Sequence, residues 1–133
     1  MFCCDTGDSG NVTYEVKARS KYNKIMDVTK GSVYSFSASG EWKDAIIKSS
    51  PDGYVLYGGI CNSLLRYKKE DSKYFTLIGC VLDKDSKEIE SFRIGSGTQH
   101  TFKTSGKLCM YANDGKNFYF NNSGSITVSV KKQ

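Results

Sequence analysis

The sequence is poor in the residues from which metal-binding and nucleophilic sites are usually built. Its 133 residues include one histidine, His100, and no pair of cysteines in C-x-x-C spacing. A structural zinc site is therefore not expected, because such sites need closely spaced cysteine and histidine ligands. No nucleophile–base pair or acid–base pair is recognisable either, so we expect a non-enzymatic protein.

The sequence also lacks an apolar run of about 18 residues, the length needed for a membrane-spanning helix. The first residues show no signal-peptide pattern, which predicts a cytoplasmic protein that could act outside the cell after release. The cysteines number 5, an odd count that favours reduced thiols. We expect residues 1–10 to be a frayed terminus, and acylation at Cys3 and Cys4 is the alternative.

The charge of the chain is modest and dispersed. The formal net charge is +5 at pH 7, and the lysines are scattered instead of being gathered in one run. This distribution argues against a nucleic-acid partner. A mildly basic protein can still favour acidic glycans or membrane surfaces.

Strand-forming and turn-forming residues are abundant, whereas a helical hydrophobic period is missing. There are 9 Tyr, 7 Phe and 13 Gly but only 1 Pro. Residues 33–38, 100–103 and 125–130 alternate between apolar and polar, which is typical of strands with one buried face. The most apolar run, residues 74–82, predicts a central strand. We therefore predict an all-β protein, an antiparallel sandwich or barrel that forms a single domain over residues 1–133. The residues expected in its core are Phe36, Trp42, Leu77, Ile78, Phe92, Ile94, Leu108, Met110, Ile126 and Val128.

A short loop near the C-terminus carries several hard oxygen atoms. Asp114 stands at one end of this loop, and Asn121 and Asn122 stand at the other. The predicted flanking strands would hold these side chains close together, and carboxylate and amide oxygens are the ligands that Ca²⁺ prefers. Asn, Asp and Gly are also the ordinary residues of turns, so a plain turn is the alternative.

Several motifs occur in the order found in one protein family. The chain resembles the PA-I-type galactophilic bacterial lectins from about residue 12 to residue 130. The motifs that carry the resemblance are residues 31–33, 36–42, 51–53, 77–79, 92–95, 106–108, 113–114 and 121–125.

The resemblance implies a small jelly-roll β-sandwich that binds one Ca²⁺ and uses the ion to hold a galactose-type sugar. The side-chain ligands would be Asp114, Asn121 and Asn122. Two main-chain carbonyls, from Phe118 and from the segment near Ala45, would complete the set.

The resemblance also implies a sugar pocket beside the ion. Asp52 would supply a second acid there, because the loop at residues 51–53 would face the calcium. The partners would be galactose-type sugars or glycoconjugates, the chain could form a homo-oligomer, and membrane contact would occur only through glycans or through acylation. The implied sugar-binding residues are Pro51, Asp52, Asp114, Gly115 and Asn121.

The sequence departs from the family in ways that keep two other hypotheses open. Ser50 and Gly53 stand where the family has His and Gln, and the calcium loop carries Lys116, Phe118 and Phe120 where small residues are usual. The main alternative is a protein-interaction or oligomerisation domain with a degenerate calcium loop. The other is a calcium-dependent membrane-surface module anchored by its N-terminal cysteines.

Overall fold

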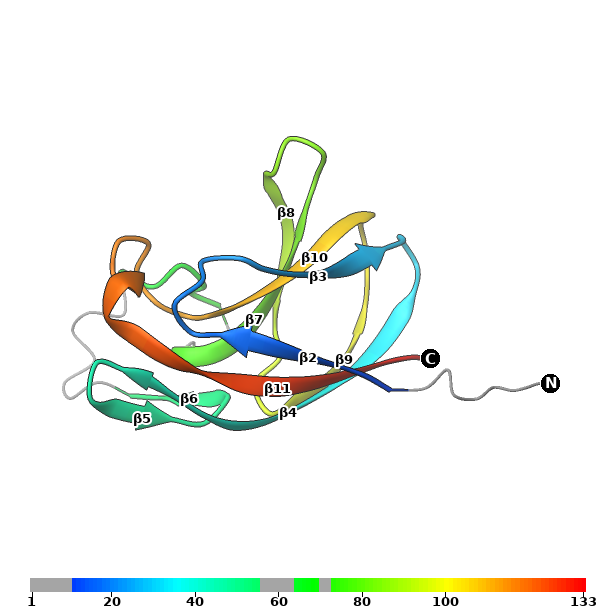
Figure 1. The fold of residues 1–133 in the computed structure, drawn as a ribbon. Helices are drawn as coiled ribbons and strands as arrows, with labels where there is room; N and C mark the ends of the chain where they lie inside the picture. The colour runs from blue at the N-terminus through cyan, green and yellow to red at the C-terminus, as the bar shows by residue number, and fades with distance from the viewer. Residues whose placement is uncertain (1–10, 56–63, 70–72) are drawn as a thin grey trace.

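The protein is a sandwich of two antiparallel β-sheets (Figure 1). The computed structural model describes residues 11–55, 64–69 and 73–133. The first sheet has the order β3-β10-β7-β6, and β8 also pairs with β7. Its strands are β3 (Asn23–Val28), β10 (Gly106–Ala112), β7 (Tyr74–Leu82), β6 (Asp52–Tyr54) and β8 (Glu88–Arg93).

The second sheet has the order β2-β11-β4-β5, and β9 also pairs with β4. The long β4 is shared along one edge, since residues 33–37 pair with β9 and residues 42–44 pair with β5. The predicted all-β antiparallel sandwich is confirmed. The strands of this sheet are β2 (Val12–Lys17), β11 (Asn122–Lys132), β4 (Val33–Asp44), β5 (Ile47–Ser49) and β9 (Gly97–Thr101).

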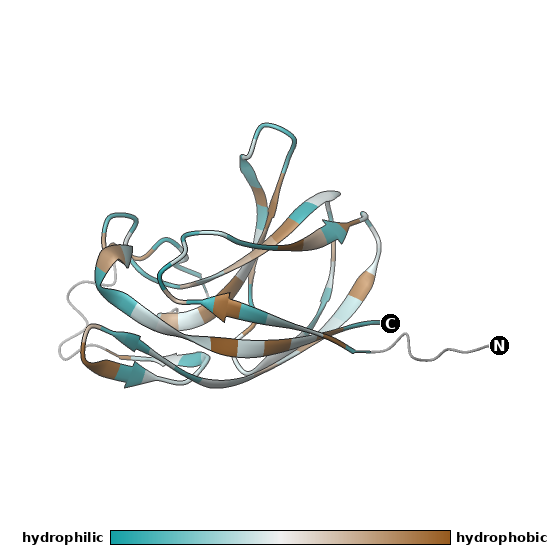
Figure 2. Ribbon diagram, in the orientation of Figure 1, coloured by the Kyte–Doolittle hydropathy of each residue, from teal (hydrophilic) through white to brown (hydrophobic). Residues whose placement is uncertain are grey.

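The main core lies between the two sheets, and every residue that we expected in the core is buried. Figure 2 shows hydrophobic and hydrophilic residues alternating along the strands. On β4, Phe36, Ala38 and Trp42 face inward, whereas the residues between them are exposed. This alternation is what a sheet with one buried face requires.

Strand β7 is buried on both of its faces, as the continuous apolar run predicted. One face joins the main core. The other carries Ile78, Cys80 and Leu82, which pack with Cys109 and Tyr111 of β10 and with Tyr67 in a smaller cluster. Cys80 and Cys109 are free, buried and directly opposite each other in the β7–β10 pair. The outer face of the first sheet therefore has a second apolar layer of its own.

The observed elements extend beyond the predicted ones at several ends. The loop expected at residues 51–53 contains the start of β6 at Asp52, and β11 begins at Asn122, before the alternating run at residues 125–130. Cys3, Cys4 and the expected frayed terminus over residues 1–10 lie outside the described residues. The part of the chain that the structure describes contains no helix long and apolar enough to cross a membrane.

Candidate functional site

The loop between β10 and β11 lies at one end of the sandwich and is held by its own backbone. The Phe118 N–H donates to the Gly115 carbonyl at 3.0 Å, and a short 3-10 helix, η3 (Tyr119–Asn121), follows. The buried Tyr119 hydroxyl donates to the Ala112 carbonyl at 2.5 Å, across the base of the loop. The loop therefore folds back compactly and places Asn122 at the start of β11.

The turn after β4 closes onto this loop. Ala45 has a left-handed backbone (φ 56°), and its N–H donates to the Asn121 carbonyl at 3.1 Å. In the β4–β11 ladder, Asp44 is the direct partner of Asn122. Ala45 therefore lies beside the loop that carries Asp114, as predicted. Asp44, its neighbour in the chain, lies beside the same loop.

Two buried oxygen atoms at this place have no hydrogen-bond donor. Asp114 is 3% exposed; its Oδ1 accepts the Gly115 N–H at 2.8 Å, but its Oδ2 has no partner among the described residues. The Asn122 side chain donates through Nδ2 to the Ala18 carbonyl at 3.1 Å, and its Oδ1 also has no partner there. Buried acceptors are nearly always paired, because an unpaired one costs about 1–3 kcal/mol. Such a pair of oxygens calls for a missing donor or cation.

The electrostatics of the site agree with its burial. Burial raises the pKa of Asp114 to about 6, although the Gly115 amide and the nearby Asn122 amide oppose this shift. The Asn122 amide lies close enough to favour the charged carboxylate but does not meet the geometry of a hydrogen bond to Oδ2. The nearby carboxylate of Asp44 adds to the rise. Asp44 in turn accepts a short hydrogen bond from the Tyr54 hydroxyl, and burial together with that bond raises the pKa of Tyr54. The site thus concentrates negative charge that no described cation neutralises.

These oxygens suit a hard cation. Ca²⁺ accepts about 6–8 oxygen ligands from carboxylates, amides, carbonyls and water. Asp114 Oδ2 and Asn122 Oδ1 offer a carboxylate and an amide oxygen. Among the described residues, no three His, Cys, Asp or Glu side chains come together as a metal cluster. The donor set therefore fits calcium better than zinc.

The structure brings some of the predicted ligands together and separates others. Asp114 and Asn122 share the buried site, whereas Asn121 is exposed and uses its main-chain carbonyl to bind Ala45. Phe118 begins the turn into η3, so its main chain lies in the same loop as Asp114. Calcium ligation by Asn121 and by the Ala45 and Phe118 carbonyls stays a prediction.

The sequence had led us to expect Asp52 as the second acid beside Asp114. In the structure, the acid beside Asp114 is Asp44. Asp52 Oδ1 accepts the Ser96 N–H at 2.7 Å and lies 3.6 Å from Arg93 Nη2. This bond and the ion pair direct the Asp52 carboxylate toward β8 and the segment that follows it. Pro51 is buried, and its carbonyl accepts the Leu77 N–H at 2.8 Å. Sugar contacts by Pro51 and Asp52 stay predictions.

The two phenylalanines of the loop, Phe118 and Phe120, are exposed. Phe118 covers Gly115, where an added Cβ would stand 2.5 Å from the Phe118 ring. Gly115 is therefore needed for this close approach. Phe120 is 68% exposed, and Lys116 is also exposed. The side chains of Lys116, Phe118 and Phe120 thus lie at the surface of the loop, whereas Asp114 and Asn122 are buried.

A buried asparagine that we did not single out fixes the neighbouring segment. Asn113 Oδ1 accepts the Tyr67 N–H at 2.9 Å, and its Nδ2 donates to the carbonyls of Tyr67 at 2.9 Å and Lys73 at 3.2 Å. The side-chain amide of Asn113 thus bonds both the N–H and the carbonyl of Tyr67, as a neighbouring strand would, and holds residues 64–69 beside the loop. The sequence signal was the Asn-Asp pair, which also reads as a simple turn.

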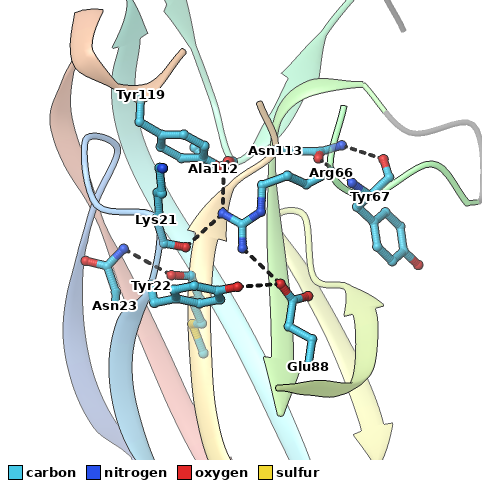
Figure 3. A network of polar contacts seen from close by, with 10 residues as sticks. Lys21, Tyr22, Asn23, Arg66, Tyr67, Glu88, Ala112, Asn113 and Tyr119 are labelled. Carbon is cyan, nitrogen blue, oxygen red and sulfur yellow. Dashed lines mark hydrogen bonds and ion pairs between the residues drawn. The ribbon is translucent and has the colours of Figure 1, made fainter. Parts of the chain in front are cut away.

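Arg66 is the second residue that sequence reasoning missed (Figure 3). Its Nη1 donates to the Lys21 carbonyl at 2.8 Å and to the Tyr119 hydroxyl at 2.9 Å, and its Nη2 lies 3.2 Å from Glu88 Oε2. Arg66 therefore ties the 64–69 segment to the candidate loop and to β8. No local pattern in the sequence indicated these distant partners.

The architecture described above is an antiparallel β-sandwich of two sheets with an oxygen-lined loop at one end. Among solved structures, the chain is similar to the EclA N-terminal domain, described as a PllA-like lectin. The TM-score is 0.69 at 16% sequence identity, and the match covers 96% of this chain and 100% of that domain. No protein-family model and no curated protein matches the sequence. The fold that the sequence motifs indicated is therefore confirmed.

Proposed function

We propose that this protein is a non-enzymatic carbohydrate-binding module that depends on calcium. The observation that carries the proposal is the pair of buried acceptors, Asp114 Oδ2 and Asn122 Oδ1, neither of which has a donor among the described residues. A cation would satisfy both oxygens and would offset the charge that Asp114 and Asp44 bring together. The lectin-like fold supports the same conclusion, because the solved structure that it resembles is described as a lectin.

Asp114 and Asn122 would hold the ion, with Asp44 adding negative charge and the carbonyls of Ala45 and Phe118 as further ligands. When bound, calcium supplies coordination positions that two neighbouring sugar hydroxyls can take in place of water. The Asp114 carboxylate can also accept a hydrogen bond from a sugar hydroxyl, and such charge-assisted bonds are stronger than neutral ones. A galactose-type sugar is the specific ligand that we propose, on the basis of the motif resemblance.

Thermal denaturation with added calcium and with chelator tests the cation. A ligand that binds only the native state raises the melting temperature, so calcium should stabilise the wild-type protein. Asp114→Asn should abolish this shift. Its new amide can donate to Asn122 Oδ1, which would satisfy an oxygen that lacks a donor. We therefore expect the metal-free variant to be as stable as the wild type or more stable.

Asp52→Asn is the matched control, because Asp52 is bound to Ser96 and Arg93. This variant should retain the full calcium shift. Calorimetric titration of galactose with and without calcium then tests the sugar. If calcium leaves the wild-type melting temperature unchanged, the lectin mechanism is wrong, and the fold would serve as an interaction or oligomerisation domain instead.

A further inference from the structure

Exposed apolar side chains gather at the end of the sandwich that carries the candidate site. We define the apolar rim as Ile46, Phe118 and Phe120, which are 91%, 46% and 68% exposed. Figure 2 shows hydrophobic colour at the β4–β5 turn and in the loop before β11, which lie at the same end of the molecule. Soluble proteins seldom leave large apolar side chains grouped in this way without a partner.

Hydrogen bonds and packing place the members of the rim close to one another. The Ala45 N–H bonds the Asn121 carbonyl at 3.1 Å, so the chain neighbours Ile46 and Phe120 flank a single main-chain contact. Phe118 is two residues from Phe120, and its ring rests on Gly115 at the other side of the same loop. Two adjacent turns therefore present the rim together.

The exposed charge around the rim is positive. Lys43 and Lys48 are exposed and directly opposite each other on the β4–β5 hairpin, and Lys116 is exposed in the loop just before Phe118. Asp44 accepts the Tyr54 hydroxyl and Asp114 is 3% exposed, while the exposed Glu41 stands farther from the β4–β5 turn than Lys43, opposite Ser125. The full chain carries a net charge of +5.

We propose that the apolar rim inserts into the headgroup region of a lipid bilayer that contains anionic lipids. Aromatic and aliphatic side chains at loop tips can enter that region, while flanking lysines are attracted to the negative surface. A second copy of this chain is a poorer occupant, because a twofold contact through the rim would bring the lysines of both copies together. The proposal does not rest on sugar binding. If both hold, the candidate site would face a membrane on which glycolipids are displayed.

Co-sedimentation of the full-length chain with sugar-free vesicles tests this proposal. Binding to phosphatidylcholine vesicles should rise by about tenfold or more when phosphatidylserine is included, and added salt should reverse the gain. The measurement is made in chelator, so that the candidate cation site does not contribute. Sugar binding and rim insertion can thus succeed or fail separately.

Two sets of variants separate insertion from simple charge attraction. The Ile46→Ser, Phe118→Ser and Phe120→Ser changes, made singly and together, should reduce vesicle binding by about tenfold when combined. Ile89→Ser is the matched control, because Ile89 is an exposed side chain (41%) on β8, away from the rim. Replacing Lys43, Lys48 and Lys116 by Gln should remove the preference for anionic vesicles, whereas Lys84→Gln in the β7–β8 turn should not.

Equal binding to both vesicle types would overturn the proposal, as would unchanged binding by the combined rim variant. Circular dichroism of each variant checks that the sandwich is retained, since every changed side chain is exposed. Sedimentation equilibrium gives the remaining outcome. A dimer that the rim substitutions dissociate would show that a second copy covers the rim, and the bilayer would then be the wrong partner.

Discussion

The guanidinium carbon of Arg66 lies 3.5 Å from the ring centroid of Tyr111, on the outer face of the first sheet. The rings of Tyr22 and Tyr119 are also close, at 4.8 Å and 5.5 Å from the same carbon. Cations are attracted to aromatic faces, and the planar guanidinium can stack there while donating hydrogen bonds at its edge. Arg66 therefore packs over Tyr111 at the edge of the small cluster around Cys80 and Cys109, and its charge is satisfied by hydrogen bonds and an ion pair.

Replacement of Arg66 should destabilise the fold more than a typical surface change does. We expect Arg66→Ala to cost about 2 kcal/mol, because it removes the stacking and leaves Tyr119 and the partly buried Glu88 without their shared donor. Arg66→Lys should recover only part of the loss, since a lysine keeps the charge but not the planar fork. Urea denaturation measures both values. Equal stability of the Ala and Lys variants would argue against a role for the guanidinium geometry.

Asn113 should be as important for the 64–69 segment as any apolar residue near it. Asn113→Ala removes two buried hydrogen bonds to the main chain of Tyr67 and a partly buried one to Lys73, and we expect a loss of about 2–3 kcal/mol. Asn117→Ala, an exposed change in the adjoining loop, is the matched control and should cost less than about 0.5 kcal/mol. Limited proteolysis of the two variants gives a second readout. Similar proteolysis of both variants would show that the hydrogen bonds of Asn113 do not hold the 64–69 segment in place.

The central position of β7 sets the expected cost of truncating its core side chains. Leu77 is fully buried in the main core, so Leu77→Ala should reduce the free energy of unfolding by about 2–5 kcal/mol. Val12→Ala on β2 provides the comparison, because Val12 is 54% exposed, and it should change stability by less than about 0.5 kcal/mol. An unchanged melting temperature for Leu77→Ala would place this residue outside the core.

The pKa of Asp114 predicts two pH dependences. Burial raises this pKa to about 6, above the value near 3.9 expected in the unfolded chain, so the native state binds the proton more tightly. In chelator, the Asp114 contribution to stability should therefore fall as the pH rises from about 4 through about 6. Calcium competes with this proton, so calcium affinity should weaken as the pH falls below about 6.

Comparison with Asp114→Asn isolates this titration from that of the other carboxylates. Melting curves in chelator at about pH 5 and about pH 7 should show a smaller loss of stability with rising pH for the variant than for the wild type. Identical pH profiles would contradict the raised pKa of Asp114.

The sequence predicted those parts of the structure that depend on local pattern. The continuous apolar run gave β7 with its observed bounds, and alternation placed Phe36 and Val128 in the core. The pairing of Asp114 with Asn122 followed from strands that flank one loop. Asp44 was missed because its approach depends on the register between β4 and β11, which involves residues far apart in the chain. Arg66 was missed for the same reason, since its partners come from three separate segments.

The neighbouring thiols of Cys80 and Cys109 can be used to measure how often the outer face of the first sheet becomes exposed. Both side chains are fully buried, and contact with Cys109 together with burial raises the pKa of Cys80. An alkylating reagent can therefore reach them only when the layer that packs on this face, which includes Tyr67, moves away, so the rate of labelling measures how often that layer opens. Asp114 follows shortly after the end of β10. Because Asn113, the neighbour of Asp114, holds Tyr67 over the two thiols by hydrogen bonds, we expect their labelling rate to fall when the oxygen site is occupied.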